Sequence, residues 1–185
     1  MSESRKKVAP IIASVVGALL VAFLWVLVTA EPNTADDADS PLLGQPAPSV
    51  VSTTLDDEEF VLANRKGSWV IFNFFNSTCV PCIAEHPELV AFSERELQAT
   101  NPAEIYTVIN DDNDASVRAF FAKNGGDWQK VRDTDGAISV AFGVAKVPET
   151  WVIDPNGYVR LRIAGMLTPG LLDDQLAQLK TQFGS

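Results

Sequence analysis

The sequence contains few cysteines, only one histidine and few basic residues. Two cysteines and one histidine occur in 185 residues, so no second cysteine pair is available to complete a four-cysteine metal site. The 14 basic residues are outnumbered by 24 acidic ones, and they form no basic stripe or arm that would track a phosphate backbone. We therefore expect no nucleic-acid partner. The length is enough for one ordinary domain and a tail.

The one long apolar run lies near the start of the chain. Residues 8–30 carry no charge, and as a helix these 23 positions would span roughly 34 Å, enough to cross a hydrocarbon core of about 30 Å. The basic residues Arg5, Lys6 and Lys7 precede the run. Because basic flanks stay in the cytoplasm, residues 1–7 are expected there and the rest of the chain outside. The sequence thus predicts a single-pass cell-membrane protein.

A cleaved signal peptide is the alternative for this run. Val28, Thr29 and Ala30 resemble a small-residue cleavage site, but the apolar core of a signal peptide spans only about 7–15 residues. We therefore predict an uncleaved transmembrane anchor, and on either interpretation the remainder is exported, where disulfides persist. Residues 31–41 are polar, acidic and contain proline, which predicts a disordered linker. Residues 42–185 form the predicted folded domain.

Strand and helix patterns alternate through that domain. Residues 69–75 are almost continuously apolar, as in a central strand buried on both faces, and a helical pattern follows over residues 80–98. A Pro-Asn-Gly turn at residues 155–157 indicates a β-hairpin. The predicted order is two strands, β-α-β-α, a hairpin and a last helix, which gives an α/β fold with a mixed central sheet and helices on both faces. The remaining predicted segments are strands at 49–55, 59–65 and 104–110, and helices at 114–126 and 168–184.

The two cysteines lie where the predicted central strand passes into a helix, in the sequence Cys-Val-Pro-Cys. Cys79 would occupy the helix N-terminus, where unpaired N–H groups and the helix dipole favour a thiolate. Cys82 follows one turn later, placed to attack a mixed disulfide on Cys79. Pro81 lacks an N–H, which costs little in a first helical turn. The pattern predicts a redox couple with Cys79 as nucleophile and Cys82 as resolving thiol.

Other interpretations of the pair stay open. A structural disulfide across so short a loop would stabilise the fold only weakly, and two buried, inert cysteines are a further possibility. A metal site is the more specific alternative, because Cys82 and His86 share a helix face at i, i+4. Cys79, Cys82 and His86 would then hold copper or zinc in a metal-handling binding protein.

Several segments together resemble the thioredoxin superfamily, and within it the membrane-anchored TlpA/ResA/CcmG type of extracytoplasmic thiol–disulfide oxidoreductase. The stretch VIFNFFNSTCVPCIAEHPEL is similar to that group's active-site stretch. The Val-Pro at 147–148 is similar to its cis-proline loop, and GQPAPSV at 44–50 to its entry segment. The resemblance covers residues 42–185. Thr78 departs from the group, which usually carries Trp there, and this change could alter how a partner docks.

The resemblance also implies roles for residues outside the cysteine pair. It implies that Pro148 is cis and that the Val147 backbone pairs with substrate. Glu149, directly after Pro148, is expected to contact the partner and is the second candidate, after Glu85, for a proton acceptor at the cysteine pair. Asn73 takes the place of a buried aspartate of cytoplasmic thioredoxins and cannot accept a proton, so another acceptor is needed. Glu85 shares a helix face with Cys82, and the group commonly carries an acid there. Glu85 is either a solvated helix residue or a partly buried acid whose raised pKa suits a general base, and we expect the second.

The resemblance implies an exported enzyme that reduces disulfides in specific partners, such as apocytochrome c or metal-site assembly proteins. No cofactor or resident metal is implied. The chain has one dithiol, so its electrons must come from elsewhere, and a membrane thiol carrier of the DsbD/CcdA kind is the implied donor. Peroxiredoxin chemistry is set aside, because that family needs the motif Pro-x-x-x-Thr-x-x-Cys. Counted back from Cys79, Phe72 stands here at the Pro position and Asn76 at the Thr position.

Overall fold

The chain divides into two units, Met1–Asn33 and Thr34–Ser185, in a computed structural model that describes residues 4–29, 36–37 and 40–184. In the first unit, Ser4–Thr29 form helix α1, whose side chains from position 13 to position 25 are exposed. Within the described part of the chain, no helix combines the length and the apolar character needed to cross a membrane. The anchor at residues 8–30 stays a prediction.

The second unit alternates strands and helices. Its strands are β1 (Asp36–Asp37), β2 (Val51–Thr53), β3 (Glu59–Val61), β4 (Val70–Phe75), β5 (Glu104–Ile109), β6 (Lys130–Arg132), β7 (Glu149–Ile153) and β8 (Val159–Ala164). Its helices are the 3₁₀ helix η1 (Leu62–Arg65) and the α-helices α2 (Val80–Glu96), α3 (Asp114–Asn124), α4 (Ala137–Phe142) and α5 (Leu171–Phe183). The predicted central strand and the helix after it are confirmed.

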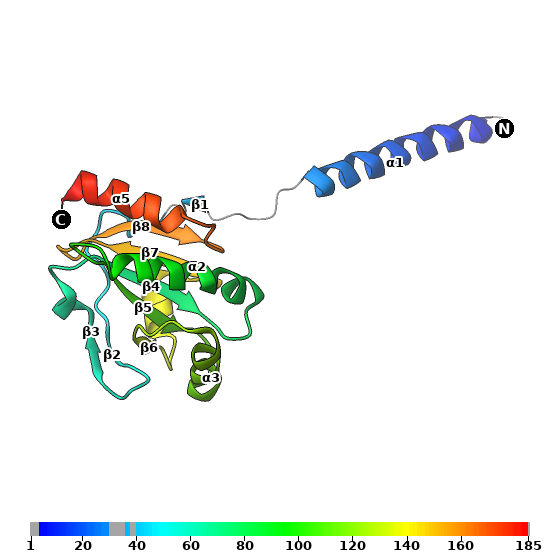
Figure 1. Ribbon diagram of the computed structural model, residues 1–185. Coiled ribbons are helices and arrows are strands. Elements are labelled where there is room, and N and C mark those ends of the chain that lie inside the picture. The colour runs from blue at the N-terminus through cyan, green and yellow to red at the C-terminus, as the bar shows by residue number, and fades with distance from the viewer. Residues whose placement is uncertain (1–3, 30–35, 38–39, 185) are drawn as a thin grey trace. The chain divides into compact units, whose positions relative to one another are not determined.

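Six strands form one mixed sheet in the order β1-β8-β7-β4-β5-β6 (Figure 1). Strand β4 lies inside it, parallel to β5 and antiparallel to β7, and the hairpin β7–β8 surrounds the predicted Pro-Asn-Gly turn. All six residues of β4 are buried. Its apolar run is therefore explained by burial on both faces of the sheet.

Helices cover both faces of this sheet, as predicted. Helices α2 and α5 pack on one face, where Leu89 and Leu176 join a cluster with Ile71 of β4. Helix α4 packs on the other face, where Phe142 contacts Phe72 and Phe74 of the same strand. Because successive strand residues point to opposite faces, odd-numbered positions of β4 face α2. The site described below depends on this alternation.

Four segments differ from the sequence prediction. In the predicted linker, Asp36 and Asp37 pair antiparallel with β8, whose edge offers unpaired backbone groups; this part is paired rather than disordered, and 31–35 and 38–39 lie outside the described residues. The predicted strand 59–65 is a strand only to Val61 and continues as η1. Strand β6 and helix α4 were not predicted, because three and six residues are too few to show a period.

Candidate active site

The loop before α2 fixes the position of the first cysteine. The Asn76 side chain accepts hydrogen bonds from the N–H and hydroxyl of Thr78, and its Nδ2 donates to the carbonyls of Asn110 and Asp111. The Ser77 N–H donates to Asp112 Oδ2 at 2.6 Å. The loop after β4 is thereby tied to the loop after the parallel strand β5. A rigid loop is what a positioned nucleophile needs.

Cys79 is the N-cap of α2, as predicted. Its Sγ lies 3.2 Å from the backbone nitrogen of Cys82 and accepts that N–H. Pro81 stands in the first turn of the helix. A negative charge that develops on this sulfur would face the N–H groups at the helix start. The structure thus supplies the electrostatic environment expected for a reactive thiolate.

The two cysteines form a disulfide, with an S–S distance of 2.21 Å. Their environments differ: Cys82 has no exposed surface, whereas Cys79 is partly exposed. A substrate sulfur arriving from solvent therefore reaches Cys79 first. This asymmetry agrees with Cys79 as nucleophile and Cys82 as resolving thiol, although the assignment of these roles stays a prediction.

The Val147-Pro148 peptide bond is cis, as the resemblance implies. The Val147 carbonyl oxygen lies 3.6 Å from Cys79 Sγ, so two segments 68 positions apart meet at the disulfide. Pro148 is buried and β7 begins directly after it. The loop therefore lies against the sulfur that would form the mixed disulfide with a substrate. Substrate pairing by Val147 stays a prediction.

Glu85 is buried beneath the cysteine pair, on the face of α2 that packs on the sheet. Its carboxylate is 2 % exposed; Oε1 accepts from Asn73 Nδ2 at 2.8 Å and Oε2 from the Leu167 N–H at 2.7 Å. Burial raises the pKa of Glu85 to about 7 from an ordinary 4.5, and the bonds from Leu167 and Asn73 oppose the rise. The expected burial and raised pKa are both confirmed, and the burial is deeper than expected. A group that titrates near neutrality can exchange a proton with a thiol.

Glu149 follows the cis-proline but does not point to the surface. Its side chain is 2 % exposed, and both carboxylate oxygens bond Arg162, at 2.9 and 3.0 Å. Oε1 also accepts from Trp151 Nε1 at 2.7 Å. These bonds fix the start of β7 to β8. The predicted contact of Glu149 with a partner stays untested, and the burial of its side chain does not favour it.

His86 is a packed residue of the α2–α3 interface. Its Nε2 lies 3.0 Å from the Gly125 carbonyl oxygen, and its ring packs on Phe120 and Phe121 with centroids 4.8 and 5.0 Å apart. Burial lowers the pKa of His86. Across residues 4–29, 36–37 and 40–184, no three His, Cys, Asp or Glu side chains gather as metal ligands would. In this oxidised structure both sulfurs are in the disulfide and His86 Nε2 faces the Gly125 carbonyl oxygen, so the alternative of a metal site at Cys79, Cys82 and His86 gains no support here and stays untested.

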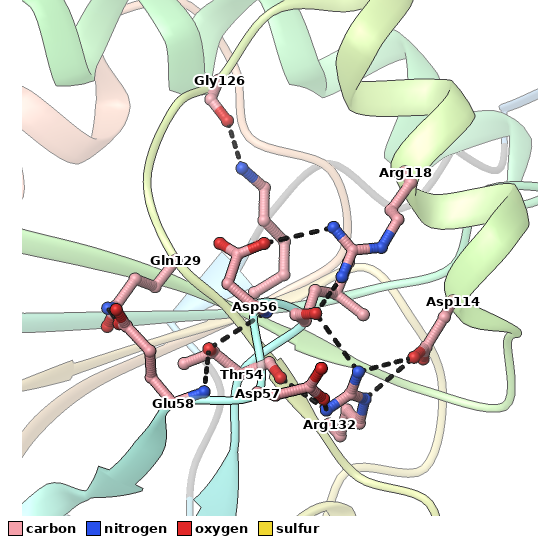
Figure 2. Close-up of polar contacts among 11 residues, drawn as sticks. Thr54, Asp56, Asp57, Glu58, Asp114, Arg118, Gly126, Gln129 and Arg132 are labelled. Atoms are coloured by element: carbon pink, nitrogen blue, oxygen red, sulfur yellow. Dashed lines mark hydrogen bonds and ion pairs between the residues drawn. The ribbon is translucent and has the colours of Figure 1, made fainter.

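No pattern in the sequence indicates which distant groups bond the segment that packs against Cys82. Leu55 packs in one cluster with Cys82, and its carbonyl oxygen accepts from both Arg118 and Arg132. Figure 2 shows these guanidinium groups reaching the turn between β2 and β3, where Arg118 meets Asp56 and Arg132 meets Asp57. The turn was predicted, but its partners lie more than 60 positions away. Only the folded chain brings them together.

The sequence and fold are similar to those of known proteins. The AhpC/TSA family model matches residues 43–162. The thiol:disulfide interchange protein HelX of Rhodobacter capsulatus is 32 % identical over 152 residues, which cover 80 % of this chain and 81 % of HelX. The thiol-disulfide oxidoreductase ResA of Bacillus subtilis is 27 % identical over 137 residues, 74 % of this chain and 75 % of ResA.

A solved structure shows the same fold. The crystal structure of a thiol:disulfide interchange protein of the thioredoxin family from Chlorobium tepidum has a TM-score of 0.65 and 24 % identity. The match covers 76 % of this chain and 98 % of that one. The fold is thus thioredoxin-like, and with the Cys79–Cys82 pair the comparisons support thiol–disulfide oxidoreductase activity. The chain belongs to the AhpC/TSA family, in the group of thiol:disulfide interchange proteins that includes HelX and ResA.

Proposed function

We propose that this domain reduces disulfides in specific exported proteins, held at the extracytoplasmic face of the cell membrane by residues 8–30. The observation that carries the proposal is the asymmetric pair, with Cys79 partly exposed at the helix N-terminus and Cys82 buried on the same helix as the buried Glu85. The exported setting follows from the uncharged run and its basic flank. The resemblance to the ResA and CcmG type suggests apocytochrome c or metal-site assembly proteins as substrates.

The surface around the pair suits a protein substrate. Val80 is 75 % exposed and Ile83 is 43 % exposed, and both lie within one turn of Cys79 on α2. Val147 is partly exposed beside the same sulfur. Apolar side chains exposed at a reactive group favour binding of another polypeptide. Thr78, which replaces the usual Trp, leaves this surface less bulky.

The reaction proceeds in two exchange steps. The Cys79 thiolate attacks one sulfur of the substrate disulfide, forming a mixed disulfide and releasing the other substrate sulfur as a thiolate. Cys82 then gives its proton to the Glu85 carboxylate and attacks the Cys79 sulfur. The second substrate sulfur leaves with the electron pair of the broken bond, and the Cys79–Cys82 disulfide forms. The substrate gains two electrons, which a membrane thiol carrier of the DsbD/CcdA kind must return to this domain.

Trapping of the mixed disulfide tests this function. Cys82→Ser expressed in its native membrane should accumulate partners linked to Cys79, because the resolving step is lost. The double variant Cys79→Ser, Cys82→Ser is the matched control and should trap nothing. Trapped partners with reducible cysteine pairs support a reductase. If Cys82→Ser captures no more than the double variant, the proposal fails.

The anchor has its own test. The intact mass of the mature protein should correspond to a chain that keeps residues 8–30, and the protein should stay with the membrane after washing at high pH. A mature chain that begins at Glu31 would show that the run is a cleaved signal peptide. The prediction of an exported domain would then be kept, and the prediction of a membrane anchor would be wrong.

A further inference from the structure

Asn73 lies at the centre of the buried layer between the sheet and α2. It is the fourth residue of β4, is 1 % exposed, and pairs in register with Thr107 of β5 and Thr150 of β7. Its odd-numbered position directs its side chain toward α2. An amide in such a place is costly unless its polar atoms are bonded. Its contacts therefore call for a functional explanation.

The amide nitrogen of Asn73 has both of its hydrogens engaged. Nδ2 donates to Glu85 Oε1 at 2.8 Å and to Thr150 Oγ1 at 3.2 Å. The reversed amide would turn its oxygen toward the carboxylate, which accepts but does not donate when ionised. Asn73 therefore holds one oxygen of the Glu85 carboxylate, while the Leu167 N–H holds the other. These two donors orient the group on the side of α2 that also carries Cys82.

The amide oxygen of Asn73 has no such partner. Oδ1 is buried and receives no hydrogen bond from any group in the described part of the chain. A buried acceptor left without a donor destabilises the fold, and each such group in a native protein calls for an explanation. In this oxidised structure Cys82 has no hydrogen to offer, because its sulfur is in the disulfide.

Reduction creates a new donor in the same layer. When the disulfide is reduced, Cys82 becomes a thiol, a weak donor with no exposed surface. Cys82 precedes Glu85 by three positions on α2, a rise of about 4.5 Å along one face. Cys82 also packs in one cluster with Phe75, the β4 residue that follows Asn73 on the same face. The new S–H group therefore forms in the layer between α2 and the face of β4 that carries Phe75 and Asn73.

We infer that Asn73 is the positioning residue for proton transfer from Cys82 to Glu85: its Nδ2 orients the carboxylate, and its Oδ1 accepts the Cys82 S–H in the reduced protein. This inference rests on the proposed function. In the step, the S–H bond turns from Asn73 Oδ1 to the Glu85 carboxylate, the proton bonds to a carboxylate oxygen, and the sulfur keeps the electron pair for its attack on Cys79. Asn73 itself neither gains nor loses a proton. An aspartate at this position would instead place a second carboxylate against Glu85.

Titration of Glu85 tests the nitrogen's role. In the oxidised protein, labelled with ¹³C at glutamate carboxyl groups, Asn73→Leu should move the Glu85 midpoint upward by about one to two pH units, since a bond to the charged form is lost. Thr107→Val is the matched control: Thr107 is equally buried and flanks Asn73, but its hydroxyl accepts from Trp128 Nε1. It should leave the midpoint in place. Equal midpoints in Asn73→Leu and the wild type would overturn the inference.

The S–H stretching band tests the oxygen's role and does not depend on the folding of Asn73→Leu. Cys79→Ser leaves Cys82 as the only thiol of the chain. With Asn73 intact, its infrared or Raman S–H band should lie at the lower frequency of a hydrogen-bonded thiol, and a band at the free-thiol frequency would overturn the inference. Neither readout uses a disulfide substrate. Failure of the trapping experiment would thus be distinguishable from failure here.

Discussion

Replacing the Glu85 carboxylate should change how the stability of the oxidised domain depends on pH. The side chain is 2 % exposed, and burial raises its pKa from an ordinary 4.5 to about 7. In the unfolded chain the same group titrates at its ordinary value. Between these two values the native state holds a proton that the unfolded state has lost. Glu85→Gln keeps the shape of the side chain and removes this difference.

The sign and size of the effect follow from linkage. Where the native state binds more protons than the unfolded state, the free energy of unfolding falls as pH rises. The stability of the wild type should therefore fall through the window from about pH 4.5 to about pH 7. The two pKa values differ by about 2.5, and each unit is worth 1.36 kcal/mol, which gives about 3 kcal/mol. Below this window both states are protonated and the group contributes no pH dependence.

The measurement is urea unfolding of wild type and Glu85→Gln at several pH values from 4 to 8, with the disulfide intact. The difference in unfolding free energy between the two should grow by about 3 kcal/mol in favour of Glu85→Gln across the window. Glu94→Gln is the matched control, because Glu94 is on the same helix but exposed. Its difference from the wild type should stay nearly flat.

Parallel stability curves for the wild type and Glu85→Gln would refute this reasoning. They would show that the carboxylate titrates alike in the native and unfolded states. The hydrogen bonds from Asn73 and Leu167 would then offset its burial completely. Such a group would be ionised throughout the physiological range, and its role as acceptor for the Cys82 proton would lose its basis.

Two further predictions concern the pair at β7 and the reactivity of the cysteines. Arg162→Met should lower the free energy of unfolding by about 3–5 kcal/mol, because Glu149 is buried and would lose its cation. Urea unfolding measures this loss, with Arg162→Lys as the control that keeps a cation. A loss in Arg162→Met no larger than that in Arg162→Lys would contradict the prediction. In the reduced domain at neutral pH, iodoacetamide should modify Cys79 before Cys82, because Cys82 has no exposed surface. Peptide mass mapping over time measures the order, and equal rates would contradict the assignment.

Local sequence determined most of the fold around the cysteines. The apolar run at residues 69–75 predicts a strand buried on both faces, and β4 has every residue buried. The helical pattern from residue 80 matches α2, and the position of Cys79 before it predicts the observed N-cap. Such features depend on side-chain period, on turn residues and on the order of strand and helix. All of them can be found within about twenty consecutive residues.

Short elements and edge pairing could not be found in this way. Strand β6 has three residues, and its pairing with β5 joins positions more than 20 apart. The pairing of Asp36 and Asp37 with β8 joins an acidic, polar segment to a strand more than 120 positions later. Neither segment has a pattern that differs from a loop. Their structure comes from the backbone groups that the sheet edge offers.

Tertiary structure alone decided the environment of each carboxylate at the site. In sequence, Glu85 is the first candidate for a proton acceptor, and Glu149 is the second candidate and the one expected to contact a partner. The fold surrounds Glu149 with Arg162, whereas Glu85 accepts hydrogen bonds from the neutral donors of Asn73 and Leu167. A guanidinium holds its carboxylate as a structural ion pair, but burial against neutral donors brings the pKa of Glu85 to about 7. The sequence determined that acids stand near the cysteines; the packing of β4, β8 and α2 decided that Glu85 is buried against neutral donors and Glu149 against a guanidinium, because these partners come from distant parts of the chain.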